Sequence, residues 1–310
     1  MAIYVLKRLL WLAPVLFGVS LVIFLSIRLI PGDPAEALAG EYATPEYVEE
    51  IRREYGLDKP IHVQYLVFLR RLARGDLGRS IRSDRPVLDE VLARFINTLH
   101  LALWSMLLAT LLGLIAGVIS ATRPYSKFDY GSMTGALLGI SMPSFWLGLI
   151  LIWFFSVQLG WLPAGGKGTV AHLVMPVFTL GATAAGLVAR MTRNSMLEII
   201  HSEYIITARA KGLADPAVHY VHALRNALLP VVTVIGLQSG YLLGGSVITE
   251  SVFAWPGLGR LIVDAIKLRD YPVVQGSLLV FALSFALVNL AVDLLYAVIN
   301  PRIRVGRGGR

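Results

Sequence analysis

The sequence predicts an all-α integral membrane protein with six transmembrane helices and a small helical segment outside the membrane. Of its 310 residues, 56% are hydrophobic and only 15% are charged, whereas soluble domains carry about 25% charged residues. The mean hydropathy is positive, at +0.67. The apolar residues are concentrated in long runs, and the charges fall between these runs. This distribution favours membrane spans over the one or two soluble domains that the length would also allow.

Six runs without Asp, Glu, Lys or Arg reach the roughly 20 residues that cross about 30 Å of hydrocarbon. They cover residues 9–27, 95–122, 130–166, 168–189, 226–249 and 271–292. The third run is too long for one helix and too short for two, and we expect a single helix over about 132–157. The alternative, buried helices of a large soluble protein, is disfavoured because such helices rarely extend this far without a charge.

The first run has a basic start, as a secretory signal peptide would. Its apolar core is longer than the typical 7–15 residues of a signal, so we expect a retained helix. Basic residues are frequent in the segments that lie inside if the N-terminus is cytoplasmic, and sparse in the short outside loops. This asymmetry predicts that both termini are cytoplasmic. It also explains the net charge of +8 without invoking nucleic acid as a partner.

We expect four parts along the chain. Residues 1–30 form the cytoplasmic N-terminus and first span, 31–94 an extracytoplasmic helical segment, 95–299 a core with five spans, and 300–310 a cytoplasmic basic tail. In the second part, Thr44 and Pro45 are typical of a helix start.

Further boundary signals follow within that extracytoplasmic segment. Gly56 can end its first helix, and Pro60 can open a second helix that stops near Gly75. Asp84 and Pro86 can start a piece that leads into the second span. Because 60-odd residues make a poor independent core, we expect the segment to pack on the spans.

The cytoplasmic loop 190–227 carries the strongest functional signal. Gly212 suits the left-handed residue that ends a helix. Asp215 followed by Pro216 is typical of a cap and first turn, so a short second helix should begin there. At helical spacing this helix places four apolar residues on one face, namely Ala217, Tyr220, Val221 and Leu224. That face could dock a partner or pack on the protein's own spans, and the residues leave both options open.

This loop resembles the coupling loop of binding-protein-dependent ABC permeases, and in particular their peptide branch. Residues 207–212 read Thr-Ala-Arg-Ala-Lys-Gly, and 222–230 read His-Ala-Leu-Arg-Asn-Ala-Leu-Leu-Pro, as in that branch. The general motif begins with Glu-Ala-Ala, and here Ile206 stands where its glutamate would be. The Leu-Pro pair at 229–230 also comes later than in the general motif.

The resemblance extends over nearly the whole chain. Further markers in order are 7–10 (Lys-Arg-Leu-Leu), 31–34 (Pro-Gly-Asp-Pro), 75–78 (Gly-Asp-Leu-Gly), 161–163 (Trp-Leu-Pro), 255–260 (Trp-Pro-Gly-Leu-Gly-Arg) and 269–272 (Arg-Asp-Tyr-Pro). Two positions depart from many members: Ile96 replaces a proline, and Asn300 replaces an aspartate. The glutathione-type relatives are similar to this chain in having that asparagine.

The resemblance implies a type I ABC importer permease in the cytoplasmic membrane, without a cofactor. Its implied partners are a second homologous permease, two ATP-binding subunits and an extracytoplasmic substrate-binding protein. The implied substrates are dipeptides, oligopeptides or glutathione, with nickel as the alternative. The residues expected to couple to the ATPases are Glu203, Thr207, Ala208, Lys211, Gly212, Asp215 and Pro216.

The chain has no phosphate-binding loop, since the nearest match, at 165–169, lacks the required spacing and hydroxyl. We therefore expect a permease that is not itself an enzyme, with ATP hydrolysed by partner subunits. A proton-coupled transporter is the alternative class, and Asp293, one turn from Asn289, would be its proton site. A structural pair is the favoured interpretation of Asp293. Among polar residues in the spans, Gln238, Ser239 and Ser246 could face a polar path.

Overall fold

The computed structural model describes residues 2–28, 34–39, 43–54 and 56–299. Within these ranges the elements are helices, and β pairing is limited to a bridge between Arg79 and Pro86. The predicted all-α class is confirmed. The basic tail 300–310, most of the marker at 31–34 and the side chains of Lys7, Arg8 and Asp293 lie outside the described residues.

Four described helical runs are long and apolar enough to cross a membrane. They are α5 (Val87–Thr122), α8 (Ala171–Ile200), the run Ala217–Val252 that includes α10 (Leu224–Val252), and the apolar part of α12 (Tyr271–Ile299). Helix α1 (Ala2–Arg28) contains a shorter apolar stretch, Leu10–Ser26. These helices coincide with the first, second, fourth, fifth and sixth predicted spans.

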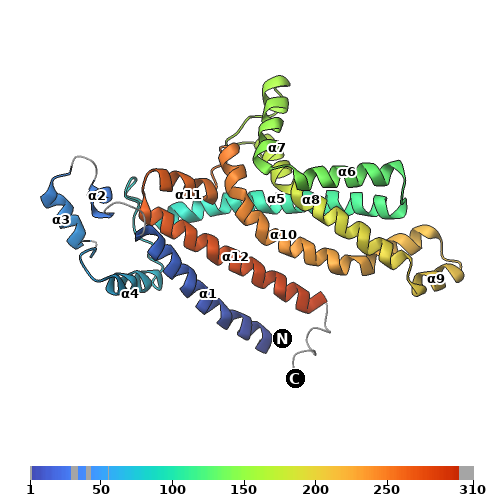
Figure 1. The fold of residues 1–310 in the computed structure, drawn as a ribbon, viewed down its shortest axis with the longest axis horizontal. Coiled ribbons are helices and arrows are strands. Elements are labelled where there is room, and N and C mark those ends of the chain that lie inside the picture. The colour runs from blue at the N-terminus through green and yellow to red at the C-terminus, as the bar shows by residue number, and fades with distance from the viewer. Residues whose placement is uncertain (1, 29–33, 40–42, 55, 300–310) are drawn as a thin grey trace. The chain divides into compact units, whose positions relative to one another are not determined.

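The third predicted span is broken. Helix α6 (Lys127–Ser141) is followed by α7 (Ser144–Leu151) and the π-helix η1 (Ile152–Gln158), and the two parts are bent by 108°. Figure 1 shows α7 turning steeply away from α6. Our expectation of one helix over 132–157 is therefore wrong.

Pro143 causes this break. Its ring restricts the preceding residue to extended conformations, and Met142 accordingly has φ −77° and ψ 128°. Proline also lacks the backbone N–H that would continue the helical hydrogen bonds. If the pair is counted as one span, the described helices include five candidates in addition to α1.

The described chain forms two compact units. The first combines Met1–Ile96 with Gly257–Ala286, and the second combines Asn97–Pro256 with Leu287–Arg310. Packing thus joins segments that are distant in sequence, whereas the functional division into four parts stays a prediction.

In the first unit, the segment before α5 contains the helices α2 (Pro34–Ala39), α3 (Pro45–Glu54) and α4 (Ile61–Leu72). The Tyr47 amide donates to Oγ1 of Thr44 over 3.4 Å, which caps α3 as predicted. The chain turns after α3 at Gly56, where φ is +66°. Pro60 directly precedes α4. These boundaries confirm the helix signals in the sequence.

Helix α4 packs on α1 through aromatic side chains. The Tyr65 and Phe24 ring centroids lie 5.0 Å apart, and the hydroxyls of Tyr65 and Ser20 are 2.9 Å apart. Phe24 and Ser20 are almost completely buried. The small helical segment therefore gains part of its core from the first span, as its size requires.

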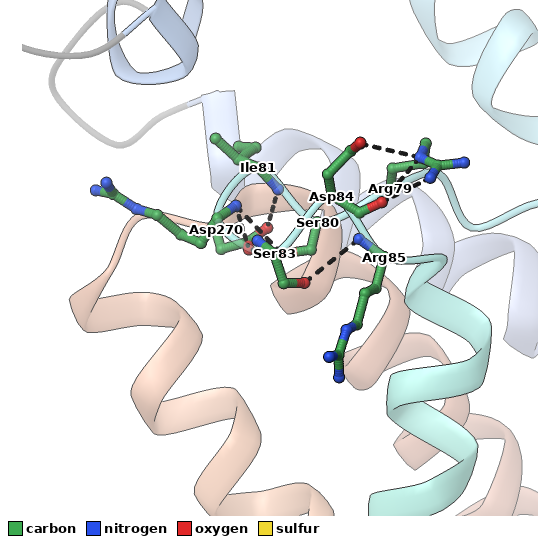
Figure 2. A network of polar contacts seen from close by, with 8 residues as sticks. Arg79, Ser80, Ile81, Ser83, Asp84, Arg85 and Asp270 are labelled. Carbon is green, nitrogen blue, oxygen red and sulfur yellow. Dashed lines mark hydrogen bonds and ion pairs between the residues drawn. The ribbon is translucent and has the colours of Figure 1, made fainter.

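The loop 79–86 is held against the turn before α12 by Asp270, as Figure 2 shows. The Asp270 carboxylate accepts hydrogen bonds from the Ser80 hydroxyl at 2.5 Å and from the Ile81 amide at 3.3 Å. Arg82 donates to the Leu268 carbonyl at 3.1 Å. The sequence markers at 75–78 and 269–272 thus lie next to each other in the fold. Gly78 is also close to Pro272, since a Cβ on Gly78 would lie 3.9 Å from the Pro272 Cβ.

Asp84 does not begin a helix, contrary to our expectation. It has a φ of 53° and pairs with Arg79 at 3.0 Å within the loop (Figure 2). Helix α5 begins at Val87, directly after Pro86. Val87 and Val91 are fully buried in an apolar cluster with residues of α11 (Leu258–Lys267) and the start of α12.

Helix α8 lies at the centre of the second unit. A Cβ on Gly113 or Gly117 of α5 would come within 3 Å of α8 backbone oxygens, so these glycines allow close packing. A Cβ on Gly139 of α6 would approach the Ala182 carbonyl of α8 as closely. Leu180 and Ala184 of α8 share a buried cluster with Leu242 of α10.

Candidate functional site

The predicted coupling loop connects α8 to α10 and contains two further helical pieces. Helix α9 (Glu203–Ala210) follows α8 after a two-residue turn, and the π-helix η2 (Ala217–Ala223) leads directly into α10. Between them Gly212 has a φ of +81°, and its amide donates to the Arg209 carbonyl over 2.9 Å. The predicted helix, turn and second helix are confirmed, with Gly212 in the left-handed conformation that favours glycine.

The second helix differs from the prediction in two respects. It is not a separate short helix, because η2 and α10 form one apolar run, Ala217–Val252. Its first hydrogen bond of i→i−4 type runs from the Val218 amide to the Ala214 carbonyl. Asp215 therefore follows the cap instead of serving as the cap, and its carboxylate pairs with Arg209 at 3.5 Å.

An apolar cluster fixes the loop to the ends of the spans. Ile205 of α9 is fully buried together with Val218 and Ala223 of η2. They contact Met196 near the end of α8 and Ala227 near the start of α10. Because core side chains are closely packed, a displacement of the loop would be transmitted to both helices.

Tyr204 adds a polar connection between α9 and the following helix. Its hydroxyl donates to the His222 carbonyl at 3.1 Å and accepts from the Asn226 side chain at 2.8 Å. The guanidinium of Arg209 lies 3.4 Å from Nε2 of His219. Both histidines thus take part in contacts within the loop, His219 through its ring and His222 through its backbone carbonyl.

The loop also carries exposed apolar side chains, which we call the loop patch. The loop patch consists of Ile206, Leu213, Tyr220 and Val221. Each is between 40% and 60% exposed. The same loop carries the exposed basic side chains of Lys211 and Arg225. Exposed apolar residues accompanied by polar ones are typical of protein–protein contact surfaces.

This patch corrects the predicted orientation of the second helix. We placed Tyr220 and Val221 on one face with Ala217 and Leu224, and left open whether that face packs internally. Internal packing uses Val218 and Ala223, five residues apart, together with Leu224 from the predicted face, whereas Tyr220 and Val221 are exposed. A π-helix repeats its hydrogen bonds every five residues rather than four, so residues that share a face are spaced further apart than the 3.6 residues of an α-helix.

The predicted coupling residues lie along this one loop. Ala208 is buried, Thr207 donates its hydroxyl to the Glu203 carbonyl at 3.1 Å, and Lys211 is exposed. The others occupy the turn and its flanks with their side chains or backbone exposed, namely Glu203, Gly212, Asp215 and Pro216.

A buried ion pair near the loop was missed from the sequence. Asp129 of α6 is 2% exposed and accepts two hydrogen bonds from Arg193 of α8, at 2.8 and 2.9 Å. The Ser120 hydroxyl and the Tyr125 amide also donate to Asp129. Arg193 lies one turn before Met196 of the loop cluster. A single acid or base at the end of a span does not indicate its partner in the sequence. The pairing of Asp129 with Arg193 results from the packing of α6 on α8.

A cavity of about 230 Å³ lies at the break between α6 and α7, bordered by α8 and α10. Of the three residues predicted to face a polar path, Gln238 lines this cavity. The hydroxyls of Ser239 and Ser246 donate to carbonyls of their own helix, at 2.9 and 2.7 Å. A role of these residues in a polar path stays a prediction.

Comparison with known proteins gives consistent matches. The family model described as the inner membrane component of binding-protein-dependent transport systems matches residues 109–305, and its N-terminal counterpart matches residues 1–102. The glutathione transport system permease protein GsiC of Escherichia coli O6:H1 is 50% identical over 301 residues, covering 97% of this chain and 98% of that protein. GsiC of Shigella boydii serotype 4 is 49% identical over the same coverage.

Solved structures share the fold. A chain of the MetNI methionine ABC transporter, in an inward-facing conformation, superposes with a TM-score of 0.58 at 24% identity, covering 68% of this chain and 96% of that chain. A chain of an amino acid ABC transporter crystallised with histidines gives a TM-score of 0.54 at 17% identity, with coverages of 69% and 94%.

Proposed function

Because the chain belongs to the family of inner membrane components of binding-protein-dependent transport systems, we propose that it forms half of the translocation path for small peptides, with glutathione as the first substrate to test. The chain is a permease subunit of an ABC importer and a multi-pass protein of the inner membrane, and ATP is hydrolysed by partner subunits. The 50% identity to a glutathione permease over 97% of the chain supports this substrate class.

The coupling loop around Gly212 is the proposed contact with the ATPases. Three observations support this assignment: the exposed loop patch, the buried cluster of Ile205, Val218 and Ala223 behind it, and the positive φ of Gly212. The patch offers an apolar surface to a groove on a partner, while the cluster connects that surface to α8 and α10. The residues proposed to mediate coupling are Glu203, Thr207, Ala208, Lys211, Gly212, Asp215 and Pro216.

The proposed assembly contains a second homologous permease, two ATP-binding subunits and an extracytoplasmic binding protein. Family membership already implies partners of these three kinds, and their number and the cytoplasmic location of both termini are part of the proposal. In this arrangement the segment 31–94 faces the binding protein, and loop 190–227 faces the ATPases.

Uptake into reconstituted vesicles tests the proposal. The chain is assembled with its second permease, ATPases and binding protein, and the uptake of labelled glutathione, a dipeptide and Ni²⁺ is measured. Glutathione or dipeptide uptake should require ATP on the ATPase side and should persist when an uncoupler collapses the proton gradient. The matched control replaces ATP by a non-hydrolysable analogue, which should abolish uptake.

Two results would contradict parts of the proposal. Uptake driven by a proton gradient without ATP would refute the ATP-driven mechanism. Uptake of Ni²⁺ but of no peptide would refute the substrate class while leaving the mechanism intact.

A further inference from the structure

We propose that the cavity at the break between α6 and α7 binds the peptide backbone of the transported substrate, and that Gln238 and Tyr241 contact it directly. This inference rests on the proposed function, since it identifies a binding site within the path of a peptide permease. The cavity is bordered by the break itself, by α8 and by one face of α10.

The size of the cavity suits part of a small peptide. Its volume of about 230 Å³ is below the 300–1,000 Å³ of complete ligand pockets, but well above the roughly 30 Å³ that one water occupies in the liquid. One or two residues of a peptide can therefore enter it, while the remainder of the substrate stays outside.

The helix break leaves backbone groups beside the cavity that need polar partners, because Pro143 interrupts the helical hydrogen-bond series. The Met142 amide still donates to the Leu138 carbonyl, and the Thr183 hydroxyl donates to the Gly139 carbonyl. Irregular backbone within a membrane is tolerated beside protein or a water-filled space, and a cavity at the break allows water or a polar ligand to pair with the groups that remain.

Gln238 is the polar side chain that distinguishes this cavity. Among the hydrogen bonds between described residues none involves its amide, whereas Thr183 on the opposite wall donates to the Gly139 carbonyl at 3.1 Å. The side chain is half-buried, and its amide atoms are not among the fully buried polar atoms that lack a partner. The amide is therefore accessible and can pair with a ligand or water that enters the cavity.

The chemistry of the lining selects uncharged polar groups. None of the described residues that line the cavity carries a charge or an imidazole, so neither a metal ion nor a charged terminus would find a counter-charge there. A glutamine amide offers one acceptor and two donors, which complements the carbonyl and N–H of a peptide bond. Tyr241, 65% exposed on the same helix face, adds an aromatic surface and a hydroxyl.

Cysteine labelling tests the site directly, because the natural chain contains no cysteine. Tyr241→Cys and the control Ser239→Cys are introduced singly and assembled into the complete transporter in vesicles. Each is treated with a small hydrophilic thiol reagent, with and without saturating glutathione or dipeptide, and modification of this chain is quantified by mass spectrometry. Substrate should slow the labelling of Tyr241→Cys about tenfold and should not slow that of Ser239→Cys.

Transport kinetics supply a second, independent measurement. Gln238→Leu removes the amide at similar volume and should raise the KM for peptide uptake about tenfold, the effect of losing one or two hydrogen bonds to the substrate. Ser239→Ala should leave KM unchanged. Size-exclusion chromatography of each complex reports whether the variant assembles, and Gln238→Asn replaces Gln238→Leu if the latter does not.

The outcomes separate this inference from the proposed function. If the unsubstituted complex imports peptides but substrate protects neither cysteine, or protects both equally, the cavity is not the contact site and the inference fails alone. If the unsubstituted complex imports no peptide, the proposed function fails first. Protection limited to Tyr241→Cys together with the raised KM supports both.

Discussion

Gly212 holds the turn between α9 and the following helix with a φ of +81°. A Cβ at this position would meet no atom within 4 Å, so steric crowding by neighbours does not explain the glycine. The backbone conformation explains the glycine. A residue with a Cβ pays about 1–2 kcal/mol to adopt the left-handed conformation, and a β-branched side chain disfavours that conformation further.

Gly212→Val should therefore displace the turn and uncouple transport from ATP hydrolysis. We expect at least a tenfold loss of substrate-stimulated ATPase activity in the reconstituted complex, with membrane insertion retained. The control is Gly131→Val, at a glycine of α6 with an ordinary helical φ and equally open surroundings. Normal stimulated activity in Gly212→Val would count against docking through this turn.

Asp129 and Arg193 show what residue identity alone does not reveal. Each is ordinary in sequence, but together they form a bidentate, largely buried ion pair between α6 and α8. Truncating one partner of such a pair leaves an uncompensated charge and is strongly destabilising. The pair therefore joins the helix before the break to the helix that enters the coupling loop.

At the scale of elements, the loop 79–86 depends on one carboxylate. Asp270 is 3% exposed and also accepts from the amides of Arg82 and Val273, each at 3.4 Å. Hydrogen bonds to a charged group contribute about 1.5–3 kcal/mol each when well formed. Removing the carboxylate should free the loop from the turn before α12 without unfolding α5.

Asp270→Ala should thus make this loop accessible to proteolysis. Limited trypsin digestion of the detergent-solubilised protein should cleave after Arg79 or Arg82 at least tenfold faster than in the natural chain, because local opening sets the rate. Asp264→Ala removes an exposed carboxylate of α11 and is the matched control. Equal cleavage rates in both variants would show that Asp270 does not hold the loop.

At the scale of the molecule, orientation in the membrane remains a prediction from the distribution of basic residues. It implies that Lys59, in the segment before α4, lies outside, and that Lys127, at the start of α6, lies inside. Both side chains are exposed in the structure. Because the chain has no cysteine, Lys59→Cys and Lys127→Cys provide a matched pair of reporters.

A membrane-impermeant maleimide should label Lys59→Cys in intact cells and Lys127→Cys only after permeabilisation. The physical reason is the retention of basic residues on the cytoplasmic side during insertion. Labelling of this chain is followed on a gel after purification. Labelling of Lys127→Cys in intact cells, with Lys59→Cys protected, would reverse the topology.

The sequence by itself determined the all-α membrane class, the positions of most spans and the turn at Gly212. Long apolar runs, capping residues and glycines act over a few neighbouring positions, so their effect can be read locally. Thr44, Gly56 and Pro60 behave as such signals predict.

Tertiary structure decided the features that depend on distant partners or on hydrogen-bond pattern. The break at Pro143 and the cavity beside it became visible only in the structure, where the two parts of the third span are bent by 108°. The buried face of η2 followed from π-helical rather than α-helical spacing, and the Asp129–Arg193 and Asp270 contacts join residues that are 64 and up to 190 positions apart. Such pairings arise from how helices pack, because a charge or proline specifies what it needs locally but not which distant residue provides it.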